Sequence, residues 1–104
     1  MYHRRGTVIG VGDRYSLTVE GLHNVSVYGI EPREVWEALH AARRLTRQVS
    51  DEANAIFGVT GKGRFLVVLV VESAGADNDW DVVAAREMFP DEVAMFDRYA
   101  GGRR

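Results

Sequence analysis

The sequence has no cysteine among its 104 residues. This absence excludes disulfide bonds, metal sites built on thiolates and a cysteine nucleophile, and it fits a reducing compartment such as the cytoplasm. Lysine is nearly absent too, because Lys62 is the only lysine among the 13 basic residues. Arginine supplies the rest, which reflects either the codon usage of a GC-rich genome or a need for bidentate phosphate contacts.

Long hydrophobic runs are also missing. The longest run, Phe65–Val71, has the length of a strand and falls far short of the roughly 20 residues that span a bilayer. The basic start Met1–Gly6 is followed only by the short segment Thr7–Gly12, so we expect no secretory signal. With 46% hydrophobic residues, the chain predicts one soluble, cytoplasmic domain that does not contact membranes.

Local patterns predict two helices. At Glu31–Glu34, acidic residues surround a proline that suits the first helical turn, and apolar residues at helical spacing continue to about Arg43. A second helix should begin at Pro90 and end before Gly101-Gly102.

Between the helices, a series of short apolar segments predicts a meander. We expect its strands at Leu45–Val49, Ala53–Val59, Arg64–Glu72 and Asp79–Ala85. The turn at Thr60–Gly63 should make the middle pair a hairpin. The run Phe65–Val71 does not alternate between apolar and polar residues, which is typical of a central strand covered on both faces.

The first residues are harder to assign. Thr7–Val11 and Tyr15–Val19 could form a short hairpin, so we treat residues 1–22 as an extension or hairpin and residues 23–104 as the main domain. The order of elements predicts the α+β class, with an antiparallel sheet of about four strands and helices packed against it.

Standard catalytic and cofactor motifs are absent from the sequence. There is no P-loop and no nucleophile elbow, and the three histidines are far apart, so we expect no cofactor and no metal. What is left is a set of charges at strand ends. Arg64 and Arg86-Glu87 should lie at one end of the sheet, because their strands are expected to be antiparallel, whereas Glu72 lies at the other end. A period of two along the last strand places Trp80, Val82, Ala84 and Arg86 on one face.

Each of these residues also has an ordinary structural interpretation. The charges could simply form surface salt bridges. We expect Trp36 and Trp80 to be core residues, although they could be platforms for stacked bases. His40 is either a half-buried surface residue or a general base.

Three pieces of the chain resemble the BrnT family, and they span Asn24 to Tyr99. The first piece is an asparagine followed five residues later by a glycine, an aliphatic residue and a helix. The second is a G-x-x-x-x-G-R-x-L hairpin. The third is an apolar strand that ends in A-A-R and is followed by a last helix. In this chain these pieces are Asn24–Trp36, Gly58–Val68 and Val83–Tyr99. Where members often carry Lys-His before the glycine, this chain has Val27-Tyr28.

The resemblance implies a fold similar to RelE and a ribonuclease toxin held inactive by a cognate antitoxin that also binds DNA. It points to Arg64 and Arg86 as polar site residues, with Glu72 and Glu92 at further matching positions.

In such a mechanism the RNA supplies its own 2′-hydroxyl nucleophile and no metal is needed. Arg64 and Arg86 would stabilise the charged phosphorane, and Lys62 would help to bind the substrate. Guanidinium stays protonated, so Glu87 or His40 would have to be the base.

Two other interpretations stay open. Val27-Tyr28 in place of Lys-His, together with the net charge of −2, favours a toxin-fold protein that has lost catalysis and acts as a protein-binding or regulatory module. The chain could also be a small-ligand domain without a catalytic role. Self-association into a homo-oligomer is possible in each case.

Overall fold

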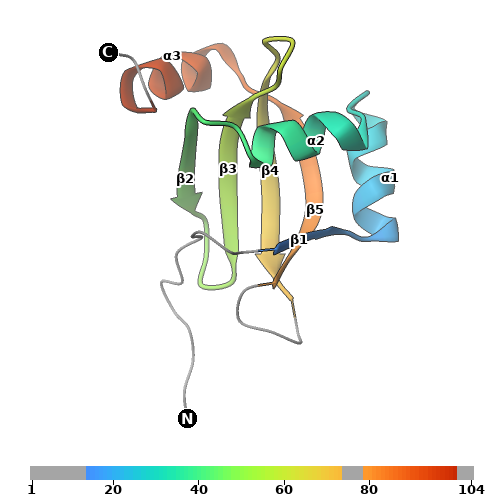
Figure 1. The fold of residues 1–104 in the computed structure, drawn as a ribbon. Coiled ribbons are helices and arrows are strands. Elements are labelled where there is room, and N and C mark those ends of the chain that lie inside the picture. The colour runs from blue at the N-terminus through green and yellow to red at the C-terminus, as the bar shows by residue number, and fades with distance from the viewer. Residues whose placement is uncertain (1–13, 74–78, 101–104) are drawn as a thin grey trace.

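The structure, a computed structural model, describes residues 14–73 and 79–100. In this part of the chain a five-stranded sheet carries three helices (Figure 1). The elements in chain order are β1 (Arg14–Leu17), α1 (Val19–Val27), α2 (Pro32–Leu39), β2 (Arg44–Gln48), β3 (Ala53–Val59), β4 (Phe65–Glu72), β5 (Asp79–Glu87) and α3 (Pro90–Tyr99).

The sheet is mixed, which corrects the expectation of about four antiparallel strands. Strands β2 to β5 form the expected antiparallel meander. β1 adds a fifth strand at the edge beside β5 and runs parallel to it, so the order is β1-β5-β4-β3-β2. The meander leaves the outer edge of β5 without a partner strand, and β1 occupies that edge. The α+β class is confirmed.

The beginning of the described chain also differs from expectation. The strand predicted at Tyr15–Val19 ends at Leu17, because Thr18 caps a helix: its Oγ1 accepts the Gly21 N–H at 2.9 Å. The helix that follows was not predicted, and the expected division between residues 22 and 23 falls inside it. The strand expected at Thr7–Val11 lies outside the described residues.

Helix α2 begins as predicted but ends earlier. Pro32 is its first residue, and the Glu31 N–H donates to Glu34 Oε1 at 3.0 Å. The helix ends at Leu39 rather than near Arg43, because the chain turns there into β2. The hairpin turn between β3 and β4 is confirmed, with the Thr60 N–H donating to the Arg64 carbonyl at 2.9 Å.

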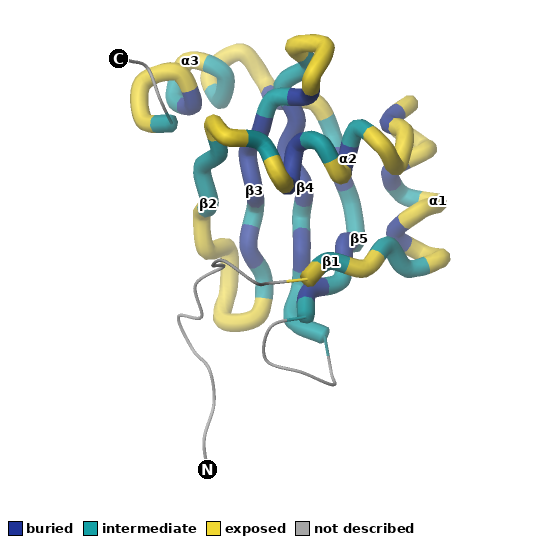
Figure 2. The backbone as a smooth tube through the Cα atoms, in the orientation of Figure 1, coloured by how far each residue is buried: buried dark blue, intermediate teal, exposed yellow. Residues whose placement is uncertain are grey.

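The two faces of the sheet are covered to different extents (Figures 1 and 2). Helix α2 crosses one face, which we call the covered face, and α1 lies along the outer edge of β5; together they bury the core of that face. That core contains Ile56, Leu66, Val68, Val70 and Val82 from the sheet. On the other face, the open face, α3 is the one described helix that packs; it lies at the end of the sheet where β5 stops and buries Phe57, Val67 and Met88 around Phe96.

β4 is the central strand, as its uninterrupted apolar sequence predicted. The expectation of cover on both faces holds only for its first half. Leu66, Val67 and Val68 are buried, but Leu69 on the open face is half-buried because α3 does not extend over it. Within residues 14–73 and 79–100, the strands therefore carry more apolar surface than the three helices cover.

A β-bulge in β5 changes which residues share a face. Leu69 pairs with Ala84, but the next residue of β4, Val70, pairs with Val82, so Val83 has no partner across β4. Trp80 and Val82 point into the covered-face core as predicted. Beyond the bulge, the alternation of β5 side chains between the two faces is reversed, and Arg86 pairs with Val67 of the open face. The prediction that these residues share one face is therefore wrong.

Helix α1 holds the bulge in place. Asn24, the first residue of the resemblance, donates from Nδ2 to the Val83 carbonyl at 2.8 Å. The approach is close because Gly21 faces β5: a Cβ added there would lie 2.0 Å from the Val82 carbonyl oxygen. The carbonyl that the bulge removes from the β4 ladder is thus satisfied by a side chain.

We predict that Asn24→Ala lowers the free energy of unfolding by about 1–2 kcal/mol, because the bulge carbonyl loses its partner in a half-buried position. Ser26→Ala is the matched control on the same helix, since the Ser26 hydroxyl is exposed and donates only to the His23 carbonyl. Urea unfolding measures both variants. Equal stability of the two would show that Asn24 does not support the bulge.

Candidate functional site

Arg64 and Arg86 are at the same end of the sheet but on opposite faces. Arg64 precedes β4 and is bonded to Glu87, whose partner across the strands is Leu66 of the covered face. Arg86 is paired with Val67 of the open face. The expectation that the two guanidinium groups converge on one anion is therefore wrong, and the bulge is the physical reason.

Arg64 fastens the β3–β4 hairpin to α2. Its Nη1 donates to Glu34 at 2.8 and 3.0 Å and to the Gly29 carbonyl at 3.3 Å, while its Nε donates to Glu87 at 2.7 Å. The carboxylates of Glu87 and Glu34 raise the pKa of Arg64. The Glu31 N–H, and then Arg64, lower the pKa of Glu34. This guanidinium is already neutralised by two carboxylates.

Lys62 lies in the same region, at the rim of a polar cavity of about 360 Å³ between α2 and the hairpin turn. The charged residues that line it are balanced, with three cations and three carboxylates: Arg33, Lys62, Arg64, Glu31, Glu34 and Glu37. One carboxylate is also engaged in structure, because Glu37 Oε1 accepts the Gly61 N–H at 3.0 Å. A cluster with equal numbers of cations and carboxylates is better suited to holding α2 and the hairpin together than to binding a phosphate.

Arg86 occupies a different environment at the end of β5. Its Nη1 and Nη2 donate to the two oxygens of Glu92 at 2.7 and 2.9 Å, and Nη1 also donates to the Glu87 carbonyl at 3.0 Å. The guanidinium carbon lies 4.2 Å from the centre of the Phe89 ring. The carboxylate of Glu92 raises the pKa of Arg86, and Arg86 in turn lowers the pKa of Glu92.

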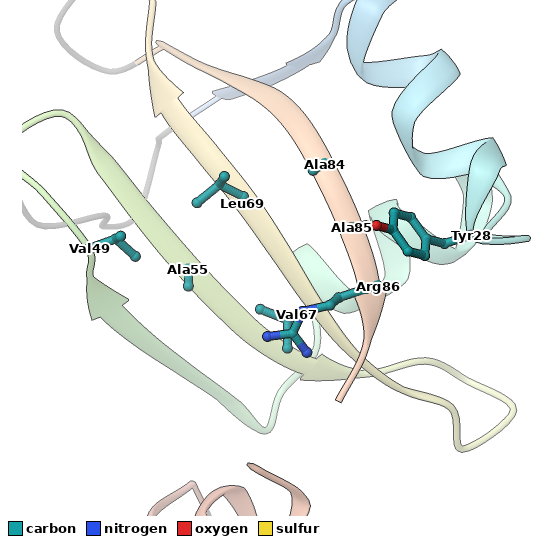
Figure 3. Close-up of a pocket in the computed structure, with 8 residues that line it drawn as sticks. All are labelled: Tyr28, Val49, Ala55, Val67, Leu69, Ala84, Ala85 and Arg86. Carbon is teal, nitrogen blue, oxygen red and sulfur yellow. The ribbon is translucent and has the colours of Figure 1, made fainter. Parts of the chain in front are cut away.

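Next to Arg86, the uncovered part of the open face forms an apolar groove of about 350 Å³ (Figure 3). Small and medium apolar side chains of β3, β4 and β5 make its floor. Tyr28 and Val49 stand at its two sides, and both are more than 60% exposed. We call it the open-face groove, lined by Tyr28, Val49, Ala55, Val67, Leu69, Ala84, Ala85 and Arg86.

Tyr28 is the residue of this groove that sequence reasoning did not identify as part of a site. It stands where the resembled family often has histidine, and that correspondence was the one available signal. In the structure it follows α1 and lines the same groove as Arg86.

The other predicted residues lie apart from this groove. His40 contacts the rings of Tyr15 and Trp36, with ring centres 5.7 and 5.9 Å away, and its Nδ1 lies 2.9 Å from the Trp36 carbonyl. Glu87 binds Arg64 on the covered face, and Glu72 pairs with Trp80 at the far end of the sheet, as expected.

The two tryptophans differ from each other. Trp80 is buried as predicted, with 1% of its surface exposed. Trp36 is 42% exposed on α2 beside Leu17, so its assignment to the core is wrong.

Comparison of the chain with protein-family models, with curated proteins and with solved structures found no match. Within residues 14–73 and 79–100, no helix is long and apolar enough to cross a membrane. The same residues contain no cluster of three histidine or carboxylate side chains arranged for a metal ion.

Proposed function

We propose that the chain is a protein-binding module whose open-face groove receives an apolar segment of a partner protein. The observation that carries this proposal is the uncovered half of the open face. The floor around Ala55, Leu69 and Ala84 is apolar, and α3 leaves it exposed. An apolar sheet face of this kind is stabilised when another layer covers it, and contiguous exposed apolar surface marks interaction sites.

The charges of the site favour binding over catalysis. Arg64 and Arg86 are each held by carboxylates, and they cannot act on the same phosphate from opposite faces. Glu92 is bonded to Arg86 of the groove, but its lowered pKa makes it a weak base at neutral pH. In the toxin-like setting that the resemblance implies, the partner would be the cognate antitoxin.

Metal-independent ribonuclease activity is the second candidate function, and one observation favours it. Arg86 and Tyr28 line the same groove, so a cation and a hydroxyl are available to one phosphodiester (Figure 3). Cleavage there would use Arg86 alone to stabilise the phosphorane, with Arg64, Lys62 and His40 outside the site.

Filling the groove tests the binding function. We predict that Ala84→Trp weakens binding of the cognate antitoxin that the resemblance implies by about 100-fold or more, because the indole occupies the floor that the partner segment would cover. Ala94→Trp, on the exposed side of α3, should bind normally. Calorimetry on purified proteins measures both, and unchanged binding by Ala84→Trp would refute the proposal.

Growth of an expression host, with cleavage of total RNA by the purified chain, separates the two candidates. A binding module leaves growth and RNA unaffected. If the wild type arrests growth and Arg86→Ala abolishes both the arrest and RNA cleavage while remaining folded, the ribonuclease function replaces the binding function.

A further inference from the structure

Arg86 has hydrogen-bonding capacity that the fold does not use. A guanidinium carries five N–H donors. Glu92 takes one from each of the two terminal nitrogens, and the Glu87 carbonyl takes the other hydrogen of Nη1. The Nε hydrogen and the second Nη2 hydrogen have no acceptor among the described residues. These two donors lie side by side on one edge of the guanidinium plane, which is the arrangement that binds a carboxylate bidentately.

This edge is held in a fixed orientation beside the groove. Glu92 binds the neighbouring Nη1–Nη2 edge through two hydrogen bonds, and Phe89 stacks on the guanidinium plane. The side chain of Arg86 is still 35% exposed, and it lines the groove. Because the donors are preorganised, a ligand that uses them loses little conformational entropy of the arginine.

Other charged groups act at this end of the open face. Arg47 of β2 pairs with Ala55 in the groove floor, and it is among the groups that lower the pKa of Glu92. Arg86 and, more weakly, Arg47 therefore both act on the carboxylate of Glu92. Asp91 also acts on Arg86, but less strongly than Glu92. A carboxylate accepts bidentately from two coplanar donors, as Glu92 already does, and the apolar floor beside the edge favours a carboxylate of a protein segment over the phosphate of a nucleic acid.

We infer that the partner segment carries an aspartate or glutamate next to its apolar residues, and that this carboxylate binds the Nε–Nη2 edge of Arg86. The inference rests on the proposed binding function and adds the chemistry of recognition to it. Arg86 is then a specificity-determining residue. The apolar floor can bind many apolar sequences, whereas the Nε–Nη2 edge of Arg86 favours those that carry an acidic residue beside the apolar ones.

A displayed library of random dodecapeptides provides the probe. Peptides are selected on the full chain, and those that lose binding to Ala84→Trp are kept, because they occupy the groove. We expect an acidic residue to be enriched in them. In a peptide where this residue is a glutamate, its replacement by glutamine should weaken binding to the wild type by about 10-fold or more.

Arg86→Lys is the informative variant, because it keeps the positive charge and removes the two-donor edge. On Arg86→Lys, the same Glu→Gln replacement in the peptide should lower the affinity by less than about 2-fold. On the control Arg33→Lys it should lower the affinity as much as on the wild type, because Arg33 is 70% exposed on α2. The NMR signal of the Arg86 Nε–H in the wild type adds a direct readout. It should move with the glutamate peptide and not with the glutamine peptide.

The outcomes separate this inference from the binding function. Groove-binding peptides without acidic enrichment, an equal Glu→Gln effect on Arg86→Lys, or an unmoved Nε–H signal would each overturn the inference and leave the binding function intact. A library that yields no peptide sensitive to Ala84→Trp would overturn both.

Discussion

Replacing Gly58 with alanine is expected to lower the free energy of unfolding by more than about 3 kcal/mol and the melting temperature by about 12 °C or more. Gly58 is a buried residue of β3, at the point where the end of α2 crosses the sheet. A Cβ at this position would lie 2.3 Å from the carbonyl oxygen of Ala38 and about 3 Å from its carbonyl carbon and Cα. All three atoms belong to the backbone, so no rotamer change can relieve the overlap.

The effect is large because the clash displaces an entire element. Helix α2 would have to move away from the sheet, and Val35, Ala38 and Leu39 are completely buried in the covered-face core. Interiors packed to crystal-like density do not accommodate such a shift without losing contacts. A domain of this size has a total stability of only about 5–15 kcal/mol, so the loss is a large fraction of it.

Gly61→Ala provides the matched control, three residues further along the chain. A Cβ at Gly61 has its nearest neighbour at 3.6 Å, a carboxylate oxygen of Glu37, which is ordinary contact. Thermal melting followed by circular dichroism compares the two variants. If Gly58→Ala melts within a few degrees of Gly61→Ala, the close approach of α2 to β3 is not a feature of the folded protein.

The meander was predictable because its signals are local. A proline with acidic neighbours started α2, a glycine-containing turn fixed the β3–β4 hairpin, and an unbroken apolar run marked β4 as central. These features depend on residues a few positions apart, for which propensity and periodicity carry information.

What the sequence did not reveal depends on contacts between distant segments. The parallel pairing of β1 with β5 joins residues 65 positions apart, such as Arg14 and Asp79. The bulge at Val83 leaves no signature in a run of apolar residues, and Asn24, which holds it, is 59 positions away. Because a one-residue shift inverts the side chains that follow, this single feature moved Arg86 to the open face and separated the two arginines of the predicted site.

The contacts of Arg64 in the structure change the effect that is expected of Arg64→Ala. If Arg64 were the catalytic residue that the resemblance implies, the variant would stay folded and be inactive; the structure instead predicts a loss of stability of about 2 kcal/mol. The reason is Glu34, whose side chain is only 18% exposed and would be left without its cation. Arg33→Ala should change stability by less than about 0.5 kcal/mol, because that side chain is 70% exposed and its ion pair with Glu31 spans 3.5 Å.

Acid unfolding gives this prediction a second readout. The pKa of Glu34 is lowered in the folded protein, so its contribution to stability is present above its ordinary value of 4.5 and is lost as the pH falls below that value through the folded-state pKa. Arg64→Ala should reduce this acid-dependent loss but not abolish it, because the largest cause of the shift, the hydrogen bond from the Glu31 N–H, is retained. Urea unfolding between neutral pH and about pH 3 measures the dependence. If Arg64→Ala is as stable as the wild type, or shows the same acid dependence, Arg64 does not hold the hairpin to α2. Arg64 would then again be a candidate for a functional role.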